Sequence, residues 1–226
     1  MQLVVGNKNY SSWSMRPWVL MKQAGIAFNE VMVRFDAFTP DSAFKATLAQ
    51  HTPAGRVPVL LDGDFAVWDT LAIAEYLAET FPDKGLWPAD KHQRARARSL
   101  CAEMHSGFGA LRSAFPMNIE ASLPAVGERL LAEKPAVRAD LDRIVQIWSE
   151  QLQAHGGPML FGSFTIADAY FAPVVMRLAT YALPVPEAIA RYMARVQALP
   201  GVAAWCDQAL AERDFLDFEE PYRSHR

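Results

Sequence analysis

The spacing of hydrophobic and polar positions divides the first 81 residues into alternating strands and helices. Short apolar and β-branched runs predict strands at 3–5, 28–33, 57–61 and 65–68. Apolar positions that recur at helical spacing predict helices at 15–24, 39–50 and 70–77. A strand–helix–strand unit of this length implies a right-handed parallel crossover, and Asp62-Gly63 favours an antiparallel hairpin. We therefore expect a small mixed sheet covered by helices.

Local signals place the ends of these helices. Pro17 falls in the first turn of the first helix, and Gly25 is the residue that stops it. Thr39 is the expected cap of the second helix, with Pro40 at its first position. Thr70 is the expected cap of the third helix.

The rest of the chain has no strand pattern. Residues 82–92 contain two prolines and one glycine with little periodicity, which is typical of a linker. The tail after Asp214 is polar and contains Pro221, so we expect it to pack loosely. Pro135 is expected to kink or divide the second of the later helices. Helical spacing predicts these helices at 93–115, 123–155, 166–182, 187–198 and 201–212. The predicted organisation is an α/β domain at 1–81, the linker, and an all-helical domain at 93–226.

Composition excludes several classes of protein. A chain of 226 residues, of which 51% are apolar, is long enough to bury a substantial core. Its net charge of −3 gives no general attraction to nucleic acid or to acidic membranes. No apolar stretch approaches the roughly 18 residues of a membrane span, and the first residues lack a signal-peptide pattern. We expect a cytoplasmic protein whose partners are neither nucleic acid nor a membrane.

The cysteines and one basic cluster are expected to be structural. Cys101 and Cys206 lie far apart in helical patterns, so each is predicted to be a buried small hydrophobe and not part of a disulfide. No metal site is expected. A basic cluster at helical spacing indicates a solvated or subunit-facing helix. It comprises Lys91, Arg94, Arg96 and Arg98.

The segment 56–77 carries the strongest ligand-binding signal. It is predicted to form a strand led by Pro58, a tight turn, a return strand and a helix that begins after Asp69. This order places the Asp69 carboxylate and the free N–H groups of a helix start beside a proline-led edge. Such a corner suits a small zwitterionic ligand.

Ser11 and Ser12 lie at the entrance of the first helix, where serines most often act as caps. They also follow the carboxyl end of a strand, where open α/β sheets bind ligands. A catalytic triad is disfavoured, because the nearby histidine is His51 and no G-x-S-x-G motif is present. Stabilising the thiolate of a ligand fits better. A hydrogen bond to the charged sulfur contributes about 1.5–3 kcal/mol and a helix terminus about 0.3–1 kcal/mol, which together lower a thiol pKa by about two units.

The order of elements, with Val57-Pro58 and Asp69-Thr70, resembles the glutathione transferase family over nearly the whole chain. The run from Ser11 to Arg16, S-S-W-S-M-R, is similar to the S-S-C-S-W-R motif of the zeta class, with Trp13 in place of the cysteine. The resemblance implies a thioredoxin-like α/β N-terminal domain and an all-α C-terminal helical bundle.

The resemblance also implies a site for glutathione as co-substrate. Ser11 or Ser12 would donate a hydrogen bond to its sulfur, and Tyr10 is a third hydroxyl that stays open. Arg16 would be a structural ion-pair residue. Val57 would pair with the cysteinyl amide, Pro58 would be cis, and Asp69 and Thr70 would hold the γ-glutamyl ammonium and carboxylate. Trp13 and Arg56 complete the predicted glutathione-binding residues, with Arg56 reaching for the glycine carboxylate.

The second, electrophilic substrate is expected between the two domains. His105 and Arg112 are seven residues apart and therefore on one helix face, where a cation suits an anionic or carbonyl-bearing substrate. Arg177 is a further cation in a mostly apolar helix. The other candidates for this electrophile site are Tyr10, Phe108, Met117 and Asn118.

The predicted function is a homodimeric glutathione transferase in which deprotonated glutathione attacks a small electrophile. One alternative is a zeta-like cis–trans isomerase of the maleylacetoacetate type, although Trp13 replaces the cysteine of that motif. Another is a non-catalytic transferase-like module that binds partners. A dithiol oxidoreductase is disfavoured, because Ser11 and Ser14 have the C-x-x-C spacing without either sulfur.

Overall fold

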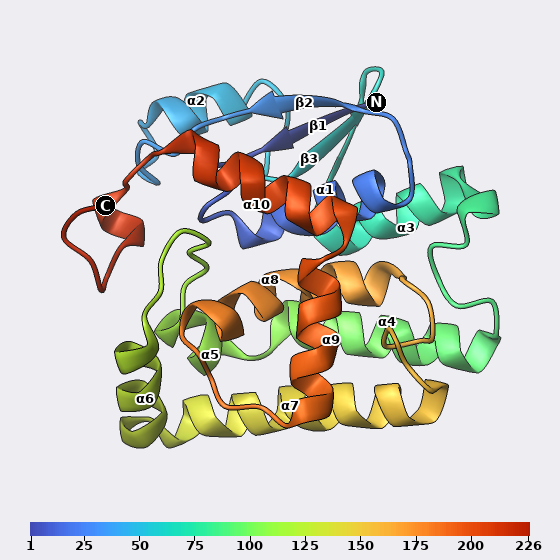
Figure 1. Cartoon of the computed structure of the whole chain (residues 1–226). Helices are drawn as coiled ribbons and strands as arrows, with labels where there is room; N and C mark the ends of the chain where they lie inside the picture. The colour runs from blue at the N-terminus through green and yellow to red at the C-terminus, as the bar shows by residue number, and fades with distance from the viewer.

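A computed structural model of residues 1–226 places a sheet domain above a bundle of helices (Figure 1). The sheet domain contains four strands and three helices. They are β1 (Gln2–Val5), α1 (Ser12–Gln23), β2 (Asn29–Met32), α2 (Ala43–Leu48), β3 (Val59–Asp62), β4 (Phe65–Trp68) and α3 (Thr70–Thr80).

The sheet is mixed, as the sequence predicts, with strand order β2-β1-β3-β4. β1 runs parallel to β2, with Leu3 opposite Glu30. β1 is antiparallel to β3, with Leu3 opposite Leu60, and β3 is antiparallel to β4 across the Asp62-Gly63 region. This topology puts the end of β1, the start of β3 and the start of α3 together at the same end of the sheet.

Two predicted helix starts are wrong. The second helix begins at Ala43, because Ser42 accepts the Lys45 N–H and Asp36 accepts the Ala43 N–H, so its first N–H groups find acceptors there instead of at Thr39. Asp69, not Thr70, caps α3.

The remaining helices form the lower part of the molecule, except α10, which lies beside α1 and the sheet (Figure 1). They are α4 (Lys91–Ser106), α5 (Gly109–Ala114), α6 (Pro124–Glu133), α7 (Pro135–His155), α8 (Ile166–Thr180), α9 (Glu187–Gln197) and α10 (Pro200–Glu212), with short 3-10 turns η1 (Pro82–Lys84) and η2 (Asp217–Glu219). Pro135 is the first residue of α7 and divides the predicted 123–155 helix. The predicted 93–115 helix is interrupted at Phe108, whose φ of +55° is left-handed.

The two parts of the molecule share one core. A continuous cluster of 51 buried residues runs from Leu3 in β1 to Trp205 in α10. Helix α1 packs against both α8 and α10, so the helix that begins at the serines lies between the sheet and the bundle. A smaller cluster fills the other face of the sheet beneath α2, around Phe35 and Phe44. No helix combines the length and apolar character needed to cross a membrane.

The polar tail is anchored, contrary to the loose packing predicted for it. Glu220 is only 4% exposed. Its carboxylate accepts hydrogen bonds from Tyr10 Oη at 2.7 Å and from Asn118 Nδ2 at 2.8 Å. Tyr222 Oη donates to the Ala114 carbonyl at 2.8 Å. The tail is held because its polar groups find partners on both domains, which a pattern based on hydrophobicity does not reveal.

The cysteines form no disulfide. Cys101 is fully buried, as expected, whereas Cys206 is only partly buried and lies 3.6 Å from the Met176 sulfur.

Candidate functional site

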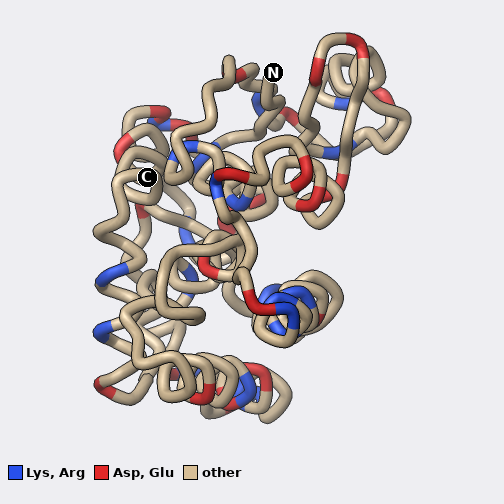
Figure 2. Tube along the Cα trace, turned by 90° about the vertical axis from the view of Figure 1, so that its right-hand side faces the viewer, with Lys and Arg blue, Asp and Glu red and all other residues tan.

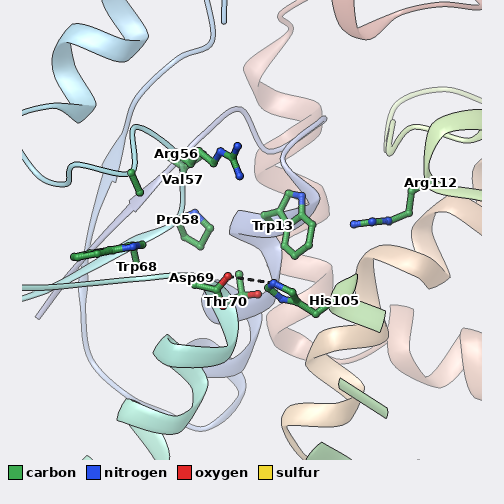
Figure 3. Close-up of a pocket in the computed structure, with 10 residues that line it drawn as sticks. Trp13, Arg56, Val57, Pro58, Trp68, Asp69, Thr70, His105 and Arg112 are labelled. Atoms are coloured by element: carbon green, nitrogen blue, oxygen red, sulfur yellow. Dashed lines mark ion pairs between the residues drawn. The ribbon is translucent and has the colours of Figure 1, made fainter. Parts of the chain in front are cut away.

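Two neighbouring cavities lie at the junction of the sheet and the helices. The first, which we call the hairpin cavity, has a volume of about 590 Å³ (Figure 3). It is lined by Trp13, Ala54, Arg56, Val57, Pro58, Trp68, Asp69, Thr70, His105 and Arg112. Every glutathione-binding residue predicted from the sequence therefore lies on this one cavity.

The second, which we call the tail cavity, has a volume of about 490 Å³. It is lined by Tyr10, Ser11, Ser12, Trp13, Phe35, Phe38, Phe44, Lys45, Gly55, Arg56, Val57, Arg112, Pro116, Met117, Arg177 and Glu219. Trp13, Arg56, Val57 and Arg112 line both cavities. The two cavities are thus adjoining halves of one candidate site.

The start of β3 forms one wall of the hairpin cavity. The Val57-Pro58 peptide bond is cis, as the family resemblance implies. The ladder between β3 and β4 begins only at Val59, so Val57 lies outside the strand pairing. Its backbone is therefore placed to pair with an extended peptide.

The start of α3 forms the adjoining part of the wall, because Trp68 at the end of β4 pairs with Val59 at the start of β3. Asp69 has a φ of +74°, a conformation that costs a non-glycine residue about 1–3 kcal/mol and is concentrated at binding sites. Its Oδ1 accepts the Leu71 N–H at 2.8 Å, and its Oδ2 lies 3.2 Å from His105 Nε2. Thr70 is 3% exposed, and its Oγ1 accepts a hydrogen bond from Tyr170 Oη at 2.8 Å. This wall offers one carboxylate beside the N–H groups of a helix start.

The two serines have different environments. Ser11 is 5% exposed and donates to Ser14 Oγ at 2.7 Å, and Ser14 Oγ in turn accepts the Gly6 N–H. Ser12 is the first residue of α1, and its Oγ accepts a hydrogen bond from Arg177 Nη2 at 3.1 Å. Because Ser12 acts only as an acceptor there, its own proton is free to be donated into the cavity.

Arg16 is buried beneath Trp13 and makes no ion pair, so its predicted role is wrong. Its Cζ lies 4.3 Å from the Trp13 ring and 4.5 Å from the Tyr170 ring. Burial lowers the pKa of Arg16 to about 10, which leaves the guanidinium charged at neutral pH. The interface between α1 and α8 offers this cation aromatic faces instead of a carboxylate.

Trp13 is one of the residues that line both cavities. Figure 3 shows Arg56 and Arg112 extending toward its ring from opposite sides. The Arg112 Cζ lies 5.5 Å from the ring centroid, and the His105 ring packs edge-on at 5.1 Å. The position that holds cysteine in the zeta motif is therefore occupied by a bulky side chain that touches three cationic or titratable groups, including Arg16.

The predicted electrophile-site residues divide into two sets. His105 lines the hairpin cavity, Arg112 lines both cavities, and Tyr10 and Met117 line the tail cavity. Phe108 and Asn118 line neither, since Phe108 joins α4 to α5 and Asn118 is 2% exposed. Tyr10 donates its hydroxyl proton to Glu220, and burial together with that bond raises the pKa of Tyr10 to about 12. Tyr10 is therefore held neutral and turned toward the tail.

Arg177 supplies a second guanidinium to the tail cavity. Its Nη1 donates to the carbonyls of Phe115 and Arg112. Burial lowers the pKa of Arg177 to about 10, so the group is charged at neutral pH. Glu219 is the acidic residue of this cavity, and burial raises the pKa of its carboxyl while Arg177 opposes that rise.

Sequence reasoning missed several residues of the tail cavity. Lys45, Phe38 and Phe44 come from the loop before α2 and from α2 itself, and Glu219 comes from the tail. A polar tail gives no periodic signal, so nothing in the sequence pointed to Glu219. The cavity does contain predicted site residues, namely Tyr10, Ser11, Ser12, Trp13, Arg56, Val57, Arg112, Met117 and Arg177. No cluster of three or more histidine, cysteine or acidic residues suited to a metal ion is present.

Comparison with known families agrees with this geometry. Residues 10–80 match the glutathione S-transferase N-terminal domain, and residues 94–208 match the C-terminal domain of the same family. The chain belongs to the glutathione S-transferase family, which confirms the family and the thioredoxin-like fold class predicted from the sequence.

Individual relatives are distant. The chain is 26% identical over 171 residues to a zeta class glutathione S-transferase of Euphorbia esula, covering 73% of this chain and 71% of the relative. It is 24% identical over 182 residues to a stringent starvation protein A homolog of Histophilus somni, covering 79% of this chain and 77% of the relative. A glutathione transferase homolog from Burkholderia, solved with bound glutathione, superposes with a TM-score of 0.70 at 27% identity, covering 93% and 98% of the two chains.

Proposed function

We propose that this protein is a glutathione transferase that stabilises the glutathione thiolate with the Ser12 hydroxyl and directs it at a small electrophile. The observation that carries the proposal is the free donor of Ser12 in the tail cavity, which adjoins a peptide-sized hairpin cavity. The sulfur would then lie at the junction of the two cavities.

The hairpin cavity would hold the γ-glutamyl and cysteinyl parts of glutathione, and the glycine end would reach Lys45 on the tail cavity. Asp69 would accept the γ-glutamyl ammonium, and the N–H groups at the start of α3 would bind the γ-glutamyl carboxylate. The backbone of Val57 would pair with the cysteinyl amide. Arg56 would bind the glycine carboxylate, together with Lys45 from α2, whose Nζ already donates to the Gly55 carbonyl at 2.7 Å.

Three local features would favour the thiolate. A hydrogen bond from the Ser12 hydroxyl contributes about 1.5–3 kcal/mol, and the N-terminus of α1 adds about 0.3–1 kcal/mol. Arg177 donates to the Ser12 oxygen and so polarises the hydroxyl. Since about 1.36 kcal/mol corresponds to one pKa unit, the bound thiol, with an ordinary pKa of about 8.5, would be mostly ionised at neutral pH.

The test is the pKa of the bound glutathione thiol, measured from the ultraviolet absorbance of its thiolate. Ser12→Ala should raise that pKa by at least about one unit and lower the turnover at neutral pH by about tenfold. Ser11→Ala is the matched control and should change the pKa far less, because Ser11 is turned toward Ser14. If the thiol pKa were the same in Ser12→Ala as in the wild type, and were raised in Ser11→Ala, the role would belong to Ser11.

Two other functions would give different results in a screen of glutathione-dependent activity across classes of electrophile. A binding module would be retained on immobilised glutathione without any turnover. A zeta-like isomerase, favoured by the similarity to a zeta class relative, would isomerise a maleyl substrate without consuming glutathione. Trp13 stands against this second reading, because it fills the position of the cysteine in the zeta motif.

We also propose that the protein is a homodimer in the cytoplasm. Phe65 and Trp68 on the edge strand β4 are 61% and 44% exposed, and they border a shallow depression shared with Tyr76. Figure 2 shows basic positions gathered on α4, the helix seen nearly end-on, whereas α3 contributes Glu75 and Glu79 to the depression.

Glu75 already pairs with Arg98 of its own chain. A second copy would cover the aromatic patch and pair Glu79 with the other cations of α4. Phe65→Glu should produce a monomer in analytical ultracentrifugation. Leu210→Glu, at another exposed apolar position, should not. A wild-type protein that is monomeric at micromolar concentration would contradict the proposal.

A further inference from the structure

The tail cavity is lined by four cationic side chains and one acidic side chain, namely Lys45, Arg56, Arg112, Arg177 and Glu219. Arg112 and Arg177 lie on its helical side, and neither guanidinium bonds a carboxylate. Arg112 Nε is buried without a hydrogen-bond partner. Glu219 is the single acidic residue in the lining, and its carboxylate accepts no hydrogen bond from the protein. With Lys45 and Arg56 assigned to the glycine carboxylate of glutathione, the charges of Arg112, Arg177 and Glu219 leave one net positive charge unneutralised.

The opposite side of the tail cavity is aromatic. Phe35, Phe38 and Phe44 pack edge-on against one another, with ring centroids 5.1 to 5.7 Å apart. Phe218 of the tail extends this wall by packing against Phe38 at 5.3 Å. Phe38 and Phe218 are both 48% exposed, so their faces are available to a flat ligand.

The tail holds Glu219 in place. The neighbouring Glu220 is fixed by Tyr10 and Asn118, and Arg223 donates to the same carboxylate. Asp214, at the other end of the tail, accepts from Asn7 Nδ2 at 2.6 Å. With both flanks anchored, Glu219 stays in the lining of the cavity that it shares with the two arginines.

We propose that the tail cavity is an electrophile subsite for aromatic monoanions, and that Glu219 is the specificity-determining residue that excludes a second negative charge. One anionic group would be held by Arg112 and Arg177, while the ring would lie against the phenylalanine wall. Lys45 and Arg56 would be engaged by the glycine carboxylate of glutathione. This inference rests on the proposed glutathione transferase function, and it names the class of its second substrate.

The test measures binding of glutathione derivatives and so requires no turnover. The probes are S-benzylglutathione and its analogues with one and with two carboxylates on the ring, titrated by calorimetry. In the wild type, one carboxylate should tighten binding by about tenfold relative to the parent compound. Two carboxylates should bind no more tightly than the parent.

Glu219→Gln should tighten binding of the dicarboxylate by about tenfold and leave S-benzylglutathione unchanged, since the amide keeps the size of the side chain. Asp217→Asn is the matched control, because Asp217 is an exposed acid in the same turn. Arg112→Gln should remove the gain made by the monocarboxylate.

The outcomes separate the two proposals. Failure of S-benzylglutathione to bind overturns the glutathione transferase function and this inference with it. Equal binding of all three probes to the wild type overturns the charge selectivity alone. A response of Asp217→Asn equal to that of Glu219→Gln would show a general surface-charge effect and would overturn the role of Glu219.

Discussion

The hairpin cavity and the tail cavity adjoin each other, yet they are built in different ways. The hairpin cavity draws most of its lining from one continuous stretch, from Ala54 to Thr70. The tail cavity draws on residues from Tyr10 to Glu219, brought together from the loop before α1, from α2, from α5 and α8 and from the tail. The lining of the hairpin cavity is therefore mostly local in sequence. The lining of the tail cavity is brought together only by the tertiary fold.

The chemistry of the two halves differs in the same way. The hairpin cavity is shaped by backbone geometry, namely a cis peptide bond at Val57-Pro58, a capped helix start and the left-handed Asp69, whose side chain also lines it. The tail cavity is shaped by charged and aromatic side chains. A backbone-based half can stay constant while the side-chain half is changed, which suits an enzyme with one fixed and one variable substrate.

Replacing the Asp69 side chain should give the largest effect that distinguishes the hairpin cavity from the tail cavity. Asp69→Ala should raise the KM for glutathione by about 30-fold, because a hydrogen bond to a charged group contributes about 1.5–3 kcal/mol. It should also lower the stability by about 1 kcal/mol, since the Leu71 N–H loses its cap. Steady-state kinetics and thermal unfolding measure the two effects.

Asp69→Asn separates them. The amide oxygen still caps Leu71 and tolerates the left-handed backbone, so the stability should be kept while the affinity for glutathione falls. If the KM for the electrophile rises instead of that for glutathione, the division of labour between the cavities is wrong.

The same contrast explains how much the sequence predicts. Local turn and helix-start signals placed Pro58 and Asp69 at one corner, because such signals are properties of neighbouring residues. The binding roles of Val57, Pro58 and Asp69 were implied only by the family resemblance. The start of α2 was misplaced because Ser42 and Asp36 offer better acceptors than Thr39, and the competition depends on a loop conformation. Local signals therefore locate elements better than they locate the ends of elements.

The tail cavity exceeds what local signals can predict. Glu219 and Glu220 occur in a polar stretch without periodicity, and their burial depends on Tyr10 and Asn118, which are distant in the sequence. Arg16 was expected to form an ion pair because a buried cation usually needs a carboxylate, but aromatic rings surround it. The partners of Glu220 and Arg16 depend on the tertiary fold and not on neighbouring residues in the sequence.

The Glu220 carboxylate anchors the tail. Burial opposes the charge of Glu220, but hydrogen bonds from Arg223, Tyr10 and Asn118 outweigh it and hold the pKa of this carboxyl below its usual value. A depressed pKa means that Glu220 stabilises the docked tail above the unfolded value of about 4.3, and that this stabilisation is lost as pH falls through the folded pKa. Acid should therefore release the tail.

Glu220→Gln should weaken docking at neutral pH by about 1–2 kcal/mol, which corresponds to about tenfold faster tryptic cleavage after Arg223. It should also lower kcat/KM for the electrophile while leaving the KM for glutathione unchanged. Asp217→Asn serves as the control with an exposed acid. Equal cleavage rates in Glu220→Gln and wild type would show that the charge does not hold the tail.

The smallest expected effect is at His105, the contact that joins the hairpin cavity to helix α4. His105 Nε2 lies 3.2 Å from Asp69 Oδ2, and both side chains are partly exposed, at 27% and 46%. Exposed pairs of this kind contribute about 0–1 kcal/mol. His105→Ala should therefore raise the KM for glutathione by about threefold, because Asp69 loses a contact that fixes its orientation.

The turnover number should stay the same in His105→Ala, since His105 lines the hairpin cavity, whereas Ser12 and Arg177 line the tail cavity. His105→Gln, which can still donate to Asp69, should restore most of the affinity for glutathione. His92→Ala, at an exposed position on the same helix, should change neither constant. A fall in kcat with an unchanged KM for glutathione would instead place His105 in the electrophile half of the site. Its assignment to the glutathione half would then be wrong.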